Sequence, residues 1–314
     1  MSGRLSRTFL VVCLSFVSTF SAFSQPWQPA RPLVFQTDFG LKDGAVSAMK
    51  GVAFQVNSEL RMFDLTHEIP AYNIWEAAFR LKQTVPYWPA GTVFVSVVDP
   101  GVGTARKSVV AKLATGQFVV TPDNGTLTFL AEHPGIEELR QIDEGKNRLP
   151  GSEKSFTFHG RDVYAYTGAR LAAGVIGFEG VGPILKEPGE PVKLPYQQPS
   201  EKDGVLKGNI PILDAQYGNA WTNIDDALFQ RLTPKKGDIF TVTIRYEGKE
   251  IYKGEMPYVA SFGDVPEGKP LLYLNSLLEI SFAVNMGNFS AQNGVQSGPE
   301  WSVEISRATS KSGS

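Results

Sequence analysis

Hydrophobic and polar positions follow two alternating patterns from residue 33 onwards. Residues 33–37 form a short apolar run, and 62–67 and 92–98 repeat it. The segment after the first run has apolar residues at helical spacing: Val46, Met49, Val52, Ala53 and Val56. The segment after the second run shows the same spacing: Ile74, Ala77, Ala78, Leu81 and Val85. Because strands that alternate with helices are typical of βαβ units, the sequence predicts a mostly parallel sheet.

Beyond these units, the sequence predicts further strands, a domain boundary and a second part with little helical spacing. Residues 108–112 and 117–121 predict two more strands joined by a turn that contains glycine. Between about 177 and 204, closely spaced prolines mark a boundary between two domains. The runs beyond it, at 208–213, 239–245 and 270–274, alternate with glycine-containing turns, so the second part reads as a small all-β barrel or sandwich.

The first 24 residues have a different pattern from the rest. Arg4 and Arg7 precede an apolar stretch over 9–17, and small residues lie ahead of Gln25. A basic region, a short apolar region and a small-residue site are typical of a secretory signal, so we expect cleavage near residue 24 and export. The alternative is an uncleaved N-terminal anchor, although the apolar run is short for a membrane span.

Composition excludes several classes of function. The chain has 314 residues, of which 42% are hydrophobic, enough for one large or two smaller cores. With 30 Lys and Arg against 32 Asp and Glu, nothing indicates a nucleic-acid partner. The one cysteine, Cys13, lies inside the predicted signal, so the mature protein would contain no thiol or disulfide.

Polar residues stand where the predicted N-terminal strands end. They are Asp38, Asp64, Asp99 and the pair Asp123 and Asn124. One such residue is ordinary turn chemistry, because Asp and Asn bond to their own backbone. Four at one edge of a parallel sheet favour a polar ligand site, since open sheets bind ligands at the carboxyl ends of their strands.

Three residues in turn-rich segments could hold and polarise one water molecule. Asp99 supplies a carboxylate, Arg106 a guanidinium and His159 an imidazole. They predict no metal site, because Arg106 cannot ligate and the chain has no His-x-x-x-His pair or cysteine cluster. Gly101 and Gly103 lack the rest of a phosphate or dinucleotide fingerprint, so we expect them to form a tight turn.

Seven ordered motifs resemble those of the S-adenosyl-L-methionine (SAM) hydroxide adenosyltransferases, hydrolases that release adenosine and L-methionine and are related to fluorinases and chlorinases. The resemblance covers roughly residues 31–307. The motifs are Thr37-Asp-Phe-Gly40, Asp64-Leu-Thr-His67, Val98-Asp-Pro-Gly-Val-Gly103 with Arg106, Pro122-Asp-Asn-Gly125, Phe158-His-Gly-Arg-Asp162, Tyr217-Gly-Asn-Ala-Trp-Thr-Asn-Ile224 and Asn275-Ser276.

The resemblance implies an α/β Rossmann-like N-terminal domain with a mostly parallel sheet and a small all-β barrel C-terminal domain. It also implies a homotrimer whose sites lie between one subunit's N-terminal domain and a neighbour's C-terminal domain. Together with the signal and the linker, the expected organisation is a signal over 1–24, the Rossmann-like domain over 31–185, a linker over 186–203, the barrel over 204–307 and a polar tail over 308–314.

Residue roles follow from the resemblance position by position. The family's water-activating Asp, Arg and His fall on Asp99, Arg106 and His159, and its ribose-binding aspartate on Asp38. The other substrate-binding positions are Tyr72 beside the sugar and sulfonium, Phe158, Asp214 and Ser276 on the methionine part, and Tyr217, Asn219 and Trp221 near the adenine. The expected ligand is SAM or adenosine, with no metal, no further cofactor and no stable membrane association after signal cleavage.

Two alternatives stay open at this point. Halogenating relatives carry aromatic residues where Asp99 and His159 stand, an inserted loop missing from 109–119, and arginines where this chain has Leu277 and Val284. These differences favour water over halide as the nucleophile. SAM is made in the cytoplasm, so an exported hydrolase would rarely meet its substrate. The alternative is therefore an exported adenosine-binding protein with little turnover. The sequence also leaves open which of Asp99 and His159 accepts the proton.

Overall fold

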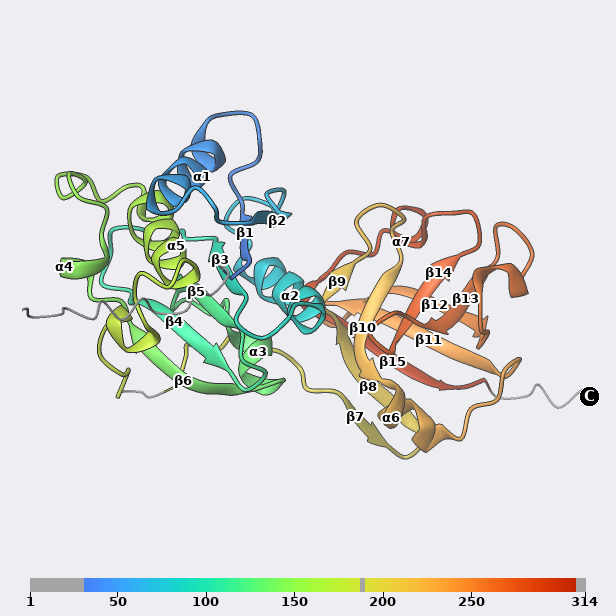
Figure 1. Ribbon diagram of the computed structural model, residues 1–314. Helices are drawn as coiled ribbons and strands as arrows, with labels where there is room; N and C mark the ends of the chain where they lie inside the picture. The colour runs from blue at the N-terminus through green and yellow to red at the C-terminus, as the bar shows by residue number, and fades with distance from the viewer. Residues whose placement is uncertain (1–30, 187–189, 309–314) are drawn as a thin grey trace, which may run out of the picture.

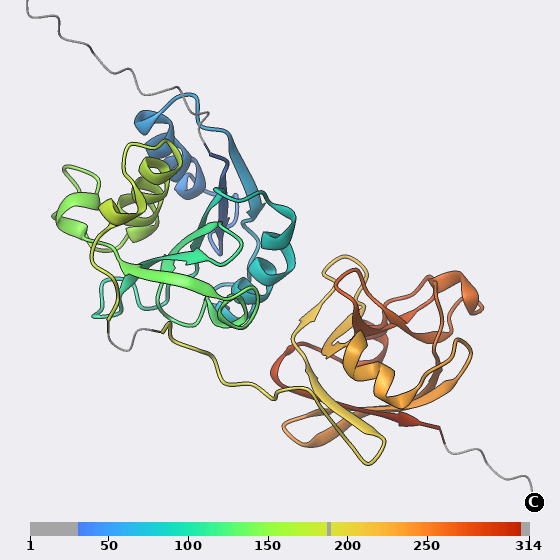
Figure 2. The ribbon, with the colours of Figure 1, turned by 60° about the horizontal axis from the view of Figure 1, so that its bottom comes forward.

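The computed structural model describes residues 31–186 and 190–308. The predicted signal over 1–24, with Cys13, lies outside them, as does most of the polar tail. Figures 1 and 2 show two groups of elements side by side: a mixed α/β group that ends near residue 185, and an all-β group that begins at residue 200. No helix in these two stretches is long and apolar enough to cross a membrane.

A six-stranded sheet forms the centre of the first group. Its order is β2-β1-β3-β5-β4-β6, in which β2, β1, β3 and β5 are mutually parallel and β4 runs antiparallel to both of its neighbours, β5 and β6. The predicted mostly parallel sheet is thus confirmed. The bounds are β1 (Leu33–Thr37), β2 (Met62–Thr66), β3 (Val93–Val97), β4 (Ser108–Leu113), β5 (Phe118–Pro122) and β6 (Ile136–Gln141).

Helices cover both faces of this sheet. α1 (Ala45–Val56), the π-helical turn η2 (Gly160–Ala165) and α5 (Tyr166–Ala172) share a core with one face, whereas α2 (Ile74–Thr84) and α3 (Thr128–Glu132) lie over the other. Gly168 lets α5 approach closely, since a Cβ there would lie 2.5 Å from the Val95 side chain. The remaining short helices are η1 (Val85–Tyr87), α4 (Glu144–Asn147) and η3 (Phe178–Val181).

The second group consists of antiparallel sheets around one apolar core. A four-stranded sheet has the order β13-β14-β10-β9, and a five-stranded sheet has the order β12-β11-β15-β8-β7. The strands are β7 (Ser200–Lys202), β8 (Val205–Ile210), β9 (Ile212–Leu213), β10 (Ala220–Asp225), β11 (Ile239–Tyr246), β12 (Lys249–Pro257), β13 (Pro270–Leu274), β14 (Glu279–Val284) and β15 (Gly298–Arg307). The short helices are α6 (Asp226–Phe229), η4 (Gln230–Leu232), η5 (Phe262–Asp264) and α7 (Phe289–Asn293).

Helix α2 joins the two groups of elements. The Trp75 indole Nε1 donates to the Pro211 carbonyl over 2.7 Å, and the Lys82 ammonium pairs with Glu279 over 2.5 Å. Glu279 is almost fully buried, and burial raises the pKa of its carboxyl even though Lys82 acts in the opposite direction. The two groups therefore share a defined contact within one chain, on the side of α2 away from its own sheet.

Candidate active site

A cavity of about 240 Å³ opens at the carboxyl ends of β1 and β3. Parallel strands present their carboxyl ends at one edge, so residues that follow different strands meet there. The cavity is lined by Asp38, Phe39, Ala71, Tyr72, Val97, Asp99, Val102, Thr157, Phe158, His159 and Gly160. Five residues predicted for the site are among them: Asp38, Tyr72, Asp99, Phe158 and His159.

Asp99 and Arg106 form a bidentate ion pair, in which Asp99 lines the cavity and Arg106 lies behind it. Arg106 Nε donates to Asp99 Oδ1 over 2.7 Å, and Arg106 Nη2 donates to Asp99 Oδ2. The turn between β3 and β4 brings them together: the Val102 amide bonds to the Asp99 carbonyl, and Gly103 adopts φ +76°. The prediction of a tight glycine turn is confirmed. Both side chains are mostly buried, which strengthens the pairing.

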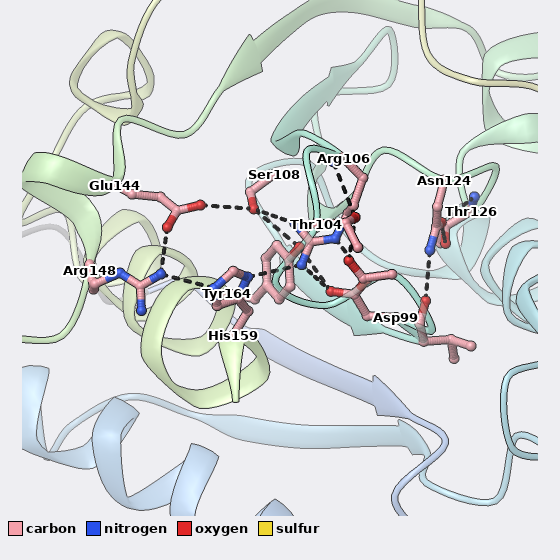
Figure 3. Close-up of polar contacts among 12 residues, drawn as sticks. Asp99, Thr104, Arg106, Ser108, Asn124, Thr126, Glu144, Arg148, His159 and Tyr164 are labelled. Atoms are coloured by element: carbon pink, nitrogen blue, oxygen red, sulfur yellow. Dashed lines mark hydrogen bonds and ion pairs between the residues drawn. The ribbon is translucent and has the colours of Figure 1, made fainter. Parts of the chain in front are cut away.

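His159 completes the group from another part of the chain. It precedes η2, is 4% exposed, and its Nδ1 lies 2.9 Å from Arg106 Nη2. Burial lowers the pKa of His159; Glu144 and Asp99 oppose this effect, whereas Arg106 and Arg148 reinforce it. The imidazole is therefore neutral at neutral pH. Asp99, Arg106 and His159 come together as one hydrogen-bonded set (Figure 3).

Four residues around this set were not predicted from the sequence. Ser108 accepts from Arg106 Nη1 over 3.1 Å, and the buried Tyr164 hydroxyl lies 3.2 Å from Ser108 Oγ and 3.4 Å from Asp99 Oδ2. Arg148 and Glu144 lie on the far side of His159 (Figure 3). Only Glu144 and Arg148 leave a sequence signal, an acid and a base four positions apart, which is common on helix surfaces.

Asp38 and two aromatic residues form the opposite wall of the cavity. Asp38 Oδ2 accepts a hydrogen bond from the Tyr72 amide over 2.9 Å, and Tyr72 adopts the left-handed φ of 68°. A left-handed backbone conformation is unfavourable for tyrosine, and the hydrogen bond from the Tyr72 amide to Asp38 helps to stabilise this turn. Phe158 packs edge to face against Phe39, with ring centres 5.8 Å apart. Within residues 31–186 and 190–308, the other Asp38 oxygen, Oδ1, accepts no hydrogen bond and can accept one from a ligand.

Only two of the four predicted strand-end acids reach this cavity. Asp64 lies within β2 and not at its end, which corrects the sequence interpretation, and its carboxylate binds Lys50 and His67 over 2.6 and 3.0 Å. Asp123 does follow β5, but its Oδ1 accepts from the Val192 amide over 2.8 Å and so holds the connecting segment. Both have structural partners that a sequence pattern does not show.

The five C-terminal residues of the predicted site line a second cavity. It measures about 700 Å³ and contains Asp214, Tyr217, Asn219, Trp221 and Ser276. The turn before β10 carries Asp214, Tyr217 and Asn219, and the Asp214 amide donates to the Asn219 carbonyl over 2.9 Å. Trp221 lies in β10 and Ser276 follows β13. Val284, at one of the positions where halogenating relatives carry arginine, lies in the same lining.

The two cavities share no lining residue, so within one chain the predicted site residues form two separate sets. The first set is charged and internally hydrogen-bonded, and the second is rich in aromatic and amide side chains. In residues 31–186 and 190–308, no three His, Cys, Asp or Glu side chains form a group that could hold a metal ion.

Comparisons with known proteins identify the family of this chain. The N-terminal and C-terminal domain models of the SAM hydroxide adenosyltransferases match residues 33–182 and 208–302. A Thermus thermophilus protein named (R)-S-adenosyl-L-methionine hydrolase is 35% identical over 274 residues, which cover 85% of this chain and 97% of that protein. A fluorinase of Actinopolyspora mzabensis is 26% identical over 304 residues, which cover 89% and 98%.

A solved structure has a similar fold. The crystal structure of an uncharacterised conserved protein from Thermotoga maritima superposes with a TM-score of 0.79 at 35% identity, covering 88% of this chain and all of that one. The two domain models together match well over half of the chain. The chain therefore belongs to the SAM hydroxide adenosyltransferase family.

Proposed function

We propose that the protein hydrolyses SAM to adenosine and L-methionine by in-line attack of water on the ribose C5′. The observation that carries this proposal is the assembly of Asp99, Arg106 and His159 at one small cavity. Relatives named (R)-S-adenosyl-L-methionine hydrolase, at 34–36% identity, support the same reaction.

The reaction places modest demands on the protein. A bond forms between the water oxygen and C5′ while the bond from C5′ to sulfur breaks, and its electron pair neutralises the sulfonium. Methionine leaves as a neutral thioether, and the water loses one proton. Because the leaving group is already good, the protein must chiefly align the water and exclude competing solvent.

The hydrogen bonds within the set divide its roles. Arg106 is a permanent cation beside the developing oxyanion. His159 has no free acceptor, since its two ring nitrogens face arginine donors at 2.9 Å each. Asp99 lines the cavity, and a carboxylate has about four acceptor sites, more than Arg106 occupies. Asp99 is accordingly the group that accepts the proton of the water, while His159 orients Arg106.

The remaining residues would hold the substrate. The free Asp38 oxygen accepts from the ribose hydroxyls, and Tyr72 and Phe158 enclose the sugar. In the second cavity, Asp214 and Ser276 bind the methionine part, and Tyr217, Asn219 and Trp221 bind the adenine. Because these two linings are separate in one chain, a complete site requires a second copy. We propose a homotrimer in which the C-terminal sheets close into a barrel and face a neighbour's N-terminal cavity.

Water is a better nucleophile than halide for this cavity. Asp99 lines the cavity with carboxylate oxygens, which can accept a proton from an attacking water, whereas a halide has no proton to donate to them. The fluorinases are also the more distant relatives, at 25–27% identity. The pattern of residues 1–24 supports export as the location of this activity.

The direct test is to incubate the purified protein with SAM in ¹⁸O-labelled water and to analyse the nucleoside by chromatography and mass spectrometry. We expect adenosine that carries the heavy oxygen at its 5′ position. A parallel reaction with chloride or fluoride should give no halogenated nucleoside. Intact SAM together with tight adenosine binding would instead contradict hydrolysis and favour an exported binding protein.

A further inference from the structure

The imidazole of His159 lies between two guanidinium groups. Arg106 Nη2 approaches its Nδ1 and Arg148 Nη2 its Nε2, each over 2.9 Å. Arginine only donates hydrogen bonds, and a neutral imidazole has one accepting nitrogen, so only one of the two contacts is a hydrogen bond. With Nδ1 accepting from Arg106, Nε2 carries the hydrogen, and Arg148 acts on the ring through its positive charge. A protonated ring would have no accepting nitrogen, and it would be a third cation in contact with two others. Both arginines therefore favour the neutral ring, and Arg148 does so from outside the water-activating set.

Glu144 fixes the position of Arg148. Its Oε2 accepts from Arg148 Nη2 over 2.6 Å, and its Oε1 lies 3.4 Å from the Ser108 hydroxyl. Since Ser108 also accepts from Arg106, the contacts form a closed ring of five residues that includes His159 (Figure 3). The Arg148 side chain is 7% exposed and the Glu144 side chain 36%, so the cation of this pair is buried while its carboxylate partly faces solvent.

The helix that carries the pair is anchored to the core. Asn147, the last residue of α4, is fully buried, and its Nδ2 donates to the carbonyls of Gly180 and Val181 over 3.0 and 2.9 Å. Its Oδ1 accepts from Arg170 of α5 over 2.7 Å. Arg148, the next residue, therefore starts from a fixed backbone position, which suits a residue that must hold a ring in one orientation.

From these contacts we propose that Arg148, held by Glu144, is a positioning residue of the active site that keeps the His159 imidazole neutral and directed at Arg106. The inference rests on the proposed function. A neutral His159 can accept from Arg106 and so helps to keep that guanidinium on Asp99. Protonation would remove this acceptor and place two cations in contact, so turnover should fall as pH decreases through the pKa of His159.

Charge substitutions give predictions of opposite sign. Four charged groups face the ring: Asp99 after β3, Arg106 before β4, and Glu144 and Arg148 from the α4 segment. Arg148→Met removes a cation, so the pKa of His159 should rise and the acid limb of kcat should move to higher pH. Glu144→Gln removes an anion, so both should move to lower pH. A purely structural role would not produce opposite shifts.

The experiment combines an imidazole titration with kinetics. The chain has three histidines, so ¹³C-labelled imidazoles give three NMR titration curves, and His159→Gln assigns the relevant one. For Arg148→Met we expect kcat to fall about ten- to a hundred-fold with a smaller change in KM. Lys146→Met is the matched control, because Lys146 is a strongly exposed cation on α4 that pairs with Asp143. It should leave the titration and kcat unchanged.

The two proposals fail in different ways. Without SAM hydrolysis by the wild type, the proposed function is wrong, whereas the titration needs no substrate and still decides whether Arg148 controls His159. Unchanged His159 titration and kcat in a folded Arg148→Met protein would overturn the inference. If that variant does not fold, Arg148→Lys and Glu144→Gln decide. The lysine variant should titrate near wild type, and a Glu144→Gln titration identical to wild type would count against the inference.

Discussion

The two cavities of this chain differ in how far contacts within the protein fix their side chains. In the N-terminal cavity, Asp99, Arg106 and His159 are bound to one another and mostly buried. In the C-terminal cavity, Tyr217 is 63% exposed and Met286 83% exposed. The three-residue set of the first cavity is thus internally fixed, although Tyr72 on the opposite wall is exposed. The second cavity presents aromatic and amide groups, of which Asn219 and Trp221 are buried and Tyr217 is exposed.

This difference separates chemistry from recognition. Charged groups that act on a developing oxyanion are most effective when their orientation costs nothing at the moment of reaction, and the buried ion pair meets that condition. An aromatic surface contributes mainly through contact area and tolerates side-chain freedom until the ligand is bound. Substitutions in the first cavity should therefore change turnover, and those in the second should change affinity.

The largest expected effect comes from Arg106→Ala. Arg106 holds Asp99 and places a fixed positive charge near the developing oxyanion, and loss of one such preorganised electrostatic group typically costs about two to three orders of magnitude in turnover, so we expect kcat for SAM to fall by roughly that factor. Adenosine affinity should stay near the wild-type value, because Arg106 lies behind Asp99 and does not line the cavity. Steady-state kinetics and calorimetric binding of adenosine measure the two quantities separately.

Stability must be checked in the same variant, since Arg106→Ala leaves the buried Asp99 carboxylate unpaired. Arg106→Lys keeps the charge and loses the planar fork, so it should fold more normally and still turn over slowly. Unchanged turnover in a folded Arg106→Ala protein would remove Arg106 from the mechanism and with it the contrast between the cavities. Unchanged turnover in Arg106→Lys would mean that the positive charge suffices without the planar fork.

Asp38→Ala should have the next largest effect, and on affinity. Hydrogen bonds to a charged group contribute about 1.5 to 3 kcal/mol, so the Kd for adenosine should rise about ten- to a hundred-fold. Asp38→Asn is the control for structure, because its amide oxygen can still accept from the Tyr72 amide. Titration calorimetry with adenosine and 2′,3′-dideoxyadenosine tests the role. Equal wild-type affinities for the two nucleosides would contradict ribose binding by Asp38.

Much of the N-terminal fold could be predicted from periodicity. The strands and helices up to β5 lie where apolar spacing placed them, because the helices bury one face each and the central strands β1, β3 and β5 are buried on both faces as continuous apolar runs. Strand β6 was not predicted, since it lies at the edge of the sheet with several exposed positions and carries little apolar signal. Among the described C-terminal strands, the predicted runs mark only β8, β9, β11 and β13, because short antiparallel strands leave weak patterns.

The candidate site was predictable only where chemistry and motif coincide. Asp99, Arg106 and His159 carry unusual groups in turns, and they meet at 2.7 and 2.9 Å. Arg148 and Glu144 look like an ordinary helical pair, so nothing in the sequence links them to His159. Their role depends on the packing of α4 against α5, which is a tertiary contact between segments distant in sequence.

Tyr217→Ala should give the smallest effect and tests the second half of the comparison. An exposed aromatic ring on a ligand surface contributes about 0.5 to 1.5 kcal/mol, so the Kd for adenosine should rise about two- to ten-fold. The kcat at saturating SAM and the melting temperature should stay near wild type, because the ring supports no core. Tyr217→Phe keeps the ring and should bind almost normally. A large fall in kcat for Tyr217→Ala would mean that the C-terminal cavity takes part in alignment of the reacting atoms, and the division between a chemical and a recognition cavity would not hold.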